Sequence, residues 1–237
     1  MDKTRIIGII GAMNIEIEGI LAQMTNVTTT NAAGIDFHQG NLGDKAVVLA
    51  RCGVGKVNAA LCTQALLDRF PVKAIINLGV AGAIDNTLNI KDVVISRHLV
   101  QHDFDITAAG DREPGEISDL GVELVADAAL VAAAAAACKQ VLSESGSKAY
   151  EAPIATGDQF VADKSVKQRI SDIFGAFCVE MEGGAIAQVC LLNNVPFVVI
   201  RAISDKADGS ATQDFMEFVA EAAENSTKIV SAMIADI

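Results

Sequence analysis

The feature that most limits the fold of this chain is an alternation between short apolar runs and longer helical patterns. Several of the runs are apolar at consecutive positions, which is typical of strands whose two faces are both covered by helices. We read five runs as strands, at residues 5–11, 45–53, 73–79, 91–100 and 196–204. Helical patterns are expected at residues 14–24, 55–69, 120–143, 163–173, 182–193 and 212–235.

A mixed sheet is expected, because residues 34–50 read as a hairpin that turns at 41–44. No repeat or linker divides the 237 residues. The sequence therefore predicts an α/β fold, a three-layer sandwich with a central mixed β-sheet flanked by helices, with residues 1–237 as a single domain. The least regular stretch, residues 103–120, is expected to be a binding lid or a subunit contact, with an ordinary solvated loop as the alternative.

Charge and hydropathy exclude several classes of function. The net charge is -12 and no basic stripe is present, which argues against nucleic acid and anionic membranes as partners. The apolar stretch at 128–138 is too short to cross a bilayer, and polar residues and a proline interrupt the one at 183–200. The N-terminal apolar run, residues 6–13, is split by glycines and followed by acids, unlike a secretory signal.

The cysteines point to a reducing compartment. They are five in number, scattered and without a C-x-x-C pair, so we expect buried free thiols and a cytoplasmic protein. The three histidines are not spaced for zinc, and no metal site is expected.

Glycine-rich turns follow three of the expected strands, at residues 8–13, 53–60 and 79–84. The second loosely matches a dinucleotide fingerprint, but the acid at the right distance, Asp68, falls within a helix. A nicotinamide oxidoreductase is therefore the weaker interpretation. The turns share a position, since each ends a strand at the edge where open α/β sheets bind ligands.

Acidic residues cluster at the same strand ends. Glu16 begins a helix after the first strand, and Asp205 follows an apolar strand that contains Arg201. The simpler interpretation of Glu16 is an acid that complements the dipole of the helix it begins. The simpler interpretation of Asp205 is a helix cap or a surface turn. Arg201 in a buried strand needs an anionic partner, and the nearest candidates are Glu180 and Glu182. Because a strand gives way to a helix between these two, one should face a pocket and the other should pack elsewhere.

Seven stretches together resemble one family along nearly the whole chain: IGIIGAMNIEI, GVGKVNAA, NLGVAGAI, LVQHDFDITAAG, ATGDQFV, CVEMEGGAIA and VPFVVIRAISDKAD. They are similar to the signatures of bacterial 5'-methylthioadenosine/S-adenosylhomocysteine nucleosidases, within the nucleoside phosphorylase superfamily. The combination of V-E-M-E with R-A-I-S-D is the most specific part.

The resemblance implies roles for individual residues. Glu16 would activate water, and Asp205 would protonate ring nitrogen 7 of adenine. Glu182, with Met181 beside it, would hold the ribose hydroxyls. Arg201 and Ser204 would position the water and Asp205. Other implied contacts are Phe160 and Val161 to adenine, Met13, Val54, Ile106 and Phe215 to the alkylthio group, and Pro114 to the partner subunit's site.

The resemblance further implies a homodimer that acts on thio-adenosine nucleosides without a metal or an organic cofactor. Two positions depart from the pattern: Val80 stands where many relatives have serine, and Ala109 where some have phenylalanine. Val80 would remove a hydroxyl near the water and the ribose, whereas Ala109 and a shorter loop to Pro114 would widen the pocket. Preference among thio-adenosines therefore stays open, as does aminofutalosine. Two further functions occur on the same fold and stay open at this point, a purine nucleoside phosphorylase and a non-catalytic storage protein.

Overall fold

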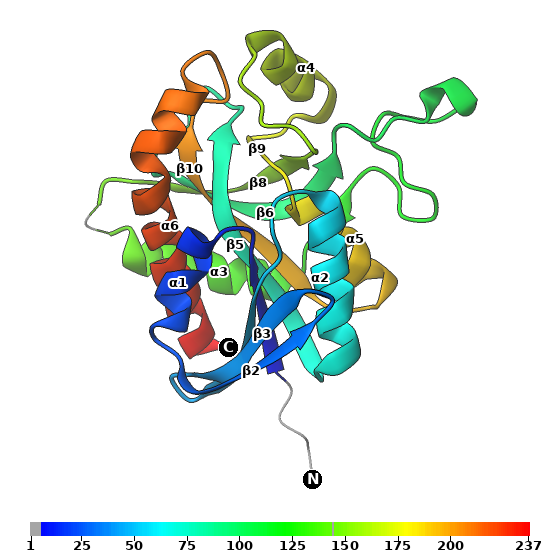
Figure 1. The fold of residues 1–237 in the computed structure, drawn as a ribbon. Coiled ribbons are helices and arrows are strands. Elements are labelled where there is room, and N and C mark those ends of the chain that lie inside the picture. The colour runs from blue at the N-terminus through cyan, green and yellow to red at the C-terminus, as the bar shows by residue number, and fades with distance from the viewer. Residues whose placement is uncertain (1–5, 144) are drawn as a thin grey trace.

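Strands and helices alternate along most of the chain, which the computed structural model describes for residues 6–143 and 145–237 (Figure 1). The strands are β1 (Ile6–Gly11), β2 (Thr25–Ala32), β3 (Ile35–Leu42), β4 (Lys45–Arg51), β5 (Val72–Ala83), β6 (Val93–Gln101), β7 (Leu124–Val125), β8 (Ala149–Thr156), β9 (Cys178–Glu180) and β10 (Phe197–Asp205). The helices are α1 (Asn14–Leu21), α2 (Lys56–Arg69), α3 (Ala128–Val141), α4 (Lys164–Phe174), α5 (Gly183–Leu192) and α6 (Ala211–Asp236). A short 3-10 helix spans Thr107–Ala109.

The sheet is mixed and partly closed. Its strand order is β10-β6-β8-β9-β5-β1-β4-β3-β2, and β10 pairs with β5 as well as with β6. Five strands, β5, β9, β8, β6 and β10, therefore form a ring, from which β1, β4, β3 and β2 extend. β1 and β10 both run parallel to β5, whereas β9 is antiparallel to it.

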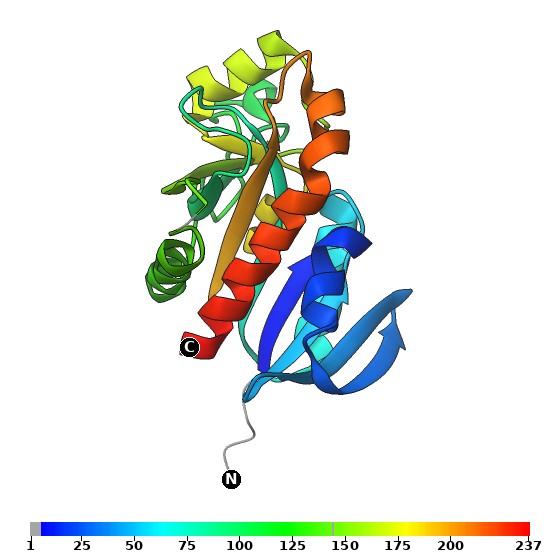
Figure 2. The same ribbon diagram turned by 90° about the vertical axis from the view of Figure 1, so that its left-hand side faces the viewer.

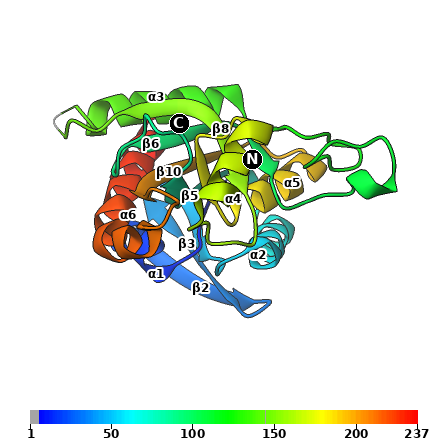
Figure 3. The same ribbon diagram turned by 90° about the horizontal axis from the view of Figure 1, so that it is seen from above.

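Helices cover both sides of this sheet, as predicted. α6 contacts β10, β5, α1 and α3, while α2 packs on α5. Figures 2 and 3 show α1 and α6 on one side of the sheet, with α2 and α5 across it. All residues of β1 and β10 are buried between these layers, which explains why their sequences are apolar on both faces. The expected three-layer α/β sandwich is confirmed.

The start of one helix differs from the sequence prediction for a physical reason. The helix expected at 120–143 begins only at Ala128, because Asp127 caps it by accepting the backbone N–H groups of Ala129 and Leu130 at 3.0 Å each. Residues ahead of the cap pair with β6 as the short strand β7. The first strand was expected from Arg5, which lies outside the described residues.

Strands β2 and β8 were not predicted. β2, TNVTTTNA, has no buried residue, so it carries no apolar signal. β8 contains a proline, which lowers the expectation of a strand.

Two further expectations concern membrane-spanning helices and the cysteines. Among the residues described, no helix combines the length and the apolar character needed to cross a membrane. All five cysteines are buried and free, as predicted.

Because β1 and β10 run parallel to β5, the carboxyl ends of these three strands lie at one edge of the sheet. The polypeptide after β1 leads into α1, and the chain after β10 leads toward α6. Residues near the two ends of the sequence are thus brought together at this edge.

Candidate active site

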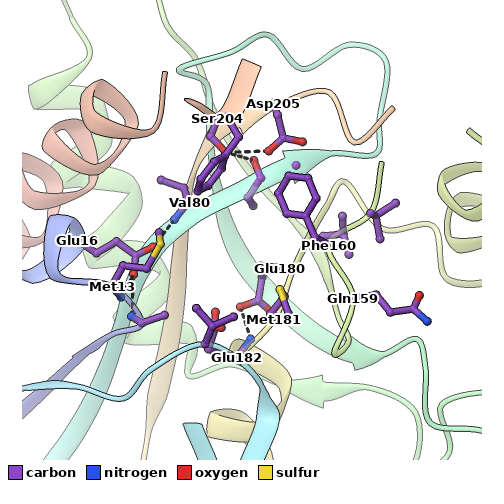
Figure 4. Close-up of a pocket in the computed structure, with 17 residues that line it drawn as sticks. Met13, Glu16, Val80, Gln159, Phe160, Glu180, Met181, Glu182, Ser204 and Asp205 are labelled. Atoms are coloured by element: carbon purple, nitrogen blue, oxygen red, sulfur yellow. Dashed lines mark hydrogen bonds between the residues drawn. The ribbon is translucent and has the colours of Figure 1, made fainter. Parts of the chain in front are cut away.

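A cavity of about 170 Å³ opens at the carboxyl ends of β1, β5 and β10 (Figure 4). Its walls come from the start of α1, from β5, from the loop after β8, from the β9–α5 junction and from the end of β10. Eleven of the fourteen residues expected at the site line it: Met13, Glu16, Val54, Val80, Phe160, Val161, Met181, Glu182, Ser204, Asp205 and Phe215.

Glu16 is a buried carboxylate held by backbone donors. Its Oε2 accepts the N–H groups of Ala12 at 2.7 Å and Met13 at 2.9 Å, and its Oε1 accepts that of Val80 at 3.1 Å. Burial raises its pKa, while the charge of Arg201 and these hydrogen bonds oppose the rise. Among the described residues, Oε1 accepts this one hydrogen bond, so a lone pair remains with which it can take a proton from a water.

Asp205 ends β10 at the opposite wall of the cavity. Its Oδ2 accepts the hydroxyl of Ser204 at 2.9 Å, and its Oδ1 accepts the N–H of Ala207 at 2.9 Å. Burial raises the pKa of Asp205, the two hydrogen bonds lower it, and the nearby Asp214 and Asp208 raise it further. A carboxyl group in this setting keeps its proton to a higher pH than an exposed aspartate.

Glu182 stands at the start of α5 and faces the cavity. Its Oε1 accepts the N–H of Gly55 at 2.9 Å. Burial and the charge of Glu180 raise its pKa to about 7, against the opposing charge of Arg201. The arrangement leaves Oε2 without a hydrogen bond from the protein among the described residues, although Arg201 Nη2 lies 3.7 Å away.

Glu180 also lines the cavity, but its carboxylate is paired with Arg201. It accepts hydrogen bonds from Nε, at 3.2 Å, and Nη2 of Arg201, from the Thr156 hydroxyl, and from the N–H of Gly183 at 2.7 Å. The second side chain bound to Arg201 is Asn77, whose Oδ1 lies 2.6 Å from Nη2. The buried arginine is therefore paired and hydrogen-bonded, as its burial requires.

Apolar side chains close the rest of the cavity. The rings of Phe160 and Phe215 meet edge to face with their centroids 5.7 Å apart. Met13, Val54 and Met181 complete a surface suited to a flat base and an apolar substituent. Figure 4 shows Phe160 near Asp205, with Met13 beside Glu16.

Comparison with known proteins agrees with this architecture. The family model described as the phosphorylase superfamily matches residues 6–235. The chain belongs to this superfamily.

Relatives within the phosphorylase superfamily match over their full lengths. A 5'-methylthioadenosine/S-adenosylhomocysteine nucleosidase from Shewanella sediminis is 42% identical, over 96% of this chain and 98% of that protein. The solved structure of the nucleosidase of the same name from Neisseria meningitidis, in complex with methylthio-immucillin-A, has a TM-score of 0.94 at 37% identity and covers 98% and 100% of the two chains. A futalosine hydrolase from Helicobacter pylori has a TM-score of 0.92 at 34% identity, covering 100% of both.

Three of the residues expected at the site do not line the cavity. Arg201 lies behind the wall, with only 1% of its surface exposed, and is hydrogen-bonded there to Glu180. Ile106 and Pro114 belong to the irregular segment between β6 and β7, which extends away from the sheet in Figure 1. Their expected contacts with an alkylthio group and with a partner subunit stay predictions.

Several residues of the site were not identified from the sequence. Asn77 binds Arg201 and donates to the carbonyl of Ile10 at 2.8 Å. Thr156 joins Glu180 to the N–H of Gly184 at 2.7 Å. An amide inside an apolar strand, as in IINLG, is the one signal that could have pointed to Asn77, because a buried polar group must be hydrogen-bonded.

The ionisable side chains that line the cavity are acids. None of the described residues that line it is a lysine, arginine or histidine, whereas four are acids. Among the described residues, no group of three or more histidine, cysteine, aspartate or glutamate side chains is arranged to hold a metal ion.

Proposed function

We propose that this chain is a hydrolase that cleaves the N-ribosidic bond of 5'-methylthioadenosine and S-adenosylhomocysteine, releasing adenine and the thioribose product. The observation that carries the proposal is a cavity with three buried carboxyl groups, Glu16, Glu182 and Asp205, at one sheet edge. Relatives that match the whole chain are nucleosidases of this class.

Asp205 is the proposed general acid. Breaking a bond between ribose and a purine requires a better leaving group, and protonation of ring nitrogen 7 of adenine supplies it. The pKa of Asp205 is raised by burial, so the carboxyl group can hold a proton for transfer. Ser204 keeps one carboxyl oxygen in place at 2.9 Å.

Glu182 is proposed to bind the ribose hydroxyls. The sugar gains positive charge as the bond breaks, and a carboxylate hydrogen-bonded to a hydroxyl stabilises that charge more in the transition state than in the ground state. The N–H of Gly55 fixes Oε1, which leaves Oε2 for substrate. Met181, adjacent in the chain, would pack beside the sugar.

Glu16 is the proposed general base. It would take a proton from a water that attacks the sugar on the face opposite the purine. Val80 contributes its backbone N–H to Glu16, so the departure from serine leaves this hydrogen bond available and removes only a hydroxyl.

The charge of the cavity favours water over phosphate as the nucleophile. A phosphorylase would need cationic donors, yet no lysine, arginine or histidine is among the described residues of the cavity wall, and Arg201 is occupied by Glu180 and Asn77. A storage-type relative would be expected to lack one of the three acids, and all three are present.

Aminofutalosine hydrolysis is the second candidate. It is favoured by the similarity to the futalosine hydrolase, which extends over the entire chain. Ala109 would leave more room than the phenylalanine of some relatives, and Val80 removes the hydroxyl that serine provides in others.

We further infer that residues 1–237 act as a single domain, because strands from both halves of the sequence build one sheet and one cavity. A homodimer is proposed, in which Pro114 reaches into the partner's site. A cytoplasmic location agrees with the buried free cysteines. If the shared site is real, sedimentation at micromolar protein will give a dimer; a fully active monomer would refute it.

Free-base release from a substrate panel tests the function. Methylthioadenosine and S-adenosylhomocysteine should both release adenine, and inosine serves as the control nucleoside. Turnover of aminofutalosine alone would select the second candidate, and no release from any of them would reject both.

A further inference from the structure

Lys56 occupies an unusual position for a lysine. It is the first residue of α2, where the helix dipole favours acids and disfavours cations. The preceding residue, Gly55, offers no side chain to cap the helix, and no acid lies in the first turn. The lysine is therefore better explained by the groups it binds than by the helix it begins.

Hydrogen bonds among Lys56, Asp103 and Asp158 form a closed ring that joins three segments of the chain. The Lys56 ammonium lies 2.6 Å from Asp103 Oδ1, after β6, and 3.2 Å from Gln101 Oε1. The Lys56 backbone N–H donates to Asp158 Oδ1, after β8, at 2.7 Å. The Asp158 N–H donates in turn to Asp103 Oδ2 at 2.8 Å. One lysine thus links two carboxylates that would otherwise repel each other.

The ring is close-fitting and partly shielded from water. The side chains of Lys56 and Asp103 are 18% and 20% exposed, so their attraction is screened less than on an open surface. Gly55 adopts a φ of +99°, and a Cβ there would lie 3.0 Å from Asp158 Oδ1. Only glycine suits both the backbone conformation and the close approach of the aspartate.

The ring also borders the cavity on two sides. Asp158 immediately precedes Gln159, Phe160 and Val161, which line it. Gly55, next to Lys56, donates its N–H to Glu182. The position of the 158–161 segment therefore depends on the loop that carries Lys56.

We propose that Lys56 is a positioning residue for the purine-binding segment, residues 158–161. Its ammonium anchors Asp103, which in turn accepts the backbone N–H of Asp158, and this places Phe160 and Val161 against the base before substrate arrives. This inference rests on the proposed function, since it assumes that the segment binds adenine. Preorganisation of this kind contributes to affinity for the base more than to the chemical step.

The test compares binding with turnover in Lys56→Met, which keeps most of the side-chain length but removes the charge. We expect the Kd for adenine, by calorimetry, and the KM for methylthioadenosine to rise about 10-fold, with kcat within about threefold of wild type. Asp103→Asn should have a similar effect, and the double variant should be no worse than the more damaging single one, because both remove the same ion pair.

Two further variants separate positioning from general damage. Lys56→Arg retains the cation and should recover most of the adenine affinity, even if Lys56→Met folds poorly. Lys73→Met removes an exposed lysine at the opposite end of β5 and should leave every constant unchanged.

The inference is overturned if Lys56→Met, or Asp103→Asn where the former does not fold, binds adenine within twofold of wild type. It is also overturned if kcat falls as much as KM rises. Failure of the wild-type protein to bind adenine would instead reject the proposed function.

Discussion

At the scale of single residues, Glu182 shows how a functional carboxylate opposes stability. Burial and the charge of Glu180 raise its pKa from an ordinary 4.5 to about 7. Between these values the folded state holds a proton that the unfolded state releases, so the contribution of Glu182 to stability falls as pH rises from about 4.5 to about 7. A neutral side chain of the same shape avoids this loss.

Glu182→Gln should therefore gain stability relative to wild type as pH increases. From pH 5 to pH 8 the difference should grow by at most about 3 kcal/mol, since each pKa unit is worth about 1.4 kcal/mol. Urea unfolding at both pH values measures it. A difference that is equal at the two pH values, or larger at pH 5, would show that Glu182 is not ionised at a cost in the folded protein.

Asp205→Asn tests the general acid. The amide can still accept the N–H of Ala207, so the fold should persist, but it has no acidic proton to give to a purine. Base release should fall at least about 10²-fold. Asp172→Asn, on the exposed side of α4, is the control. Near-wild-type release by Asp205→Asn would remove this residue from the mechanism.

The partners of Arg201 could be predicted from the sequence only in part. That a buried arginine needs an acid, and that Glu180 and Glu182 must diverge, follows from the sequence. Which of the two acids forms the hydrogen bonds does not: Glu180 forms them, and Glu182 makes the weaker contact with Arg201, at 3.7 Å. The choice depends on the strand-to-helix junction after β9, which brings Glu180 onto the guanidinium.

At the scale of elements, β5 supplies the close approach on which the site depends. A Cβ on Gly79 would lie 2.6 Å from Glu16 Oε1 and 2.9 Å from Arg201 Nη1. Gly79→Ala should displace Glu16 and lower activity by about 10²-fold, at a cost of about 1–3 kcal/mol in stability. Gly209→Ala, whose Cβ meets open space, is the control. Wild-type kinetics and unfolding for Gly79→Ala would show that the contact does not position Glu16.

Apolar strands were predictable, whereas a polar edge strand and the start of one capped helix were not. β1 and β10 are buried throughout, so their sequences carry a strong signal. β2 lies at the exposed end of the sheet and is stabilised by pairing with β3 alone, which leaves no apolar pattern. The start of α3 is set by its Asp127 cap, and a continuous apolar pattern conceals that boundary.

At the scale of the whole molecule, the pairing of β10 with β5 closes the strand ring and unites the two ends of the sequence. It places Asp205, near the C-terminus, at the same sheet edge as Glu16, near the N-terminus. Local patterns can indicate strand ends, yet the order of strands around a ring depends on long-range pairing. The sequence indicated acids at the strand ends, and the resemblance to the nucleosidases assigned Glu16, Glu182 and Asp205 to one site.

The central claim is that this acidic cavity selects water as the nucleophile. Two like charges about 4 Å apart repel by roughly 4 kcal/mol at an effective dielectric of 20, so Glu16 should exclude a phosphate dianion. The same carboxylate can take the proton that water must lose. Arg201 does not offset the repulsion, because Glu180 and Asn77 already occupy it.

The most direct measurement is product analysis with methylthioadenosine in the presence and absence of phosphate. The predicted result is adenine and free methylthioribose at a rate that added phosphate does not change. Glu16→Gln should abolish turnover without preventing binding, while Glu18→Gln, an exposed neighbour on α1, should behave as wild type. Turnover that requires phosphate and releases a ribose 1-phosphate would contradict the account.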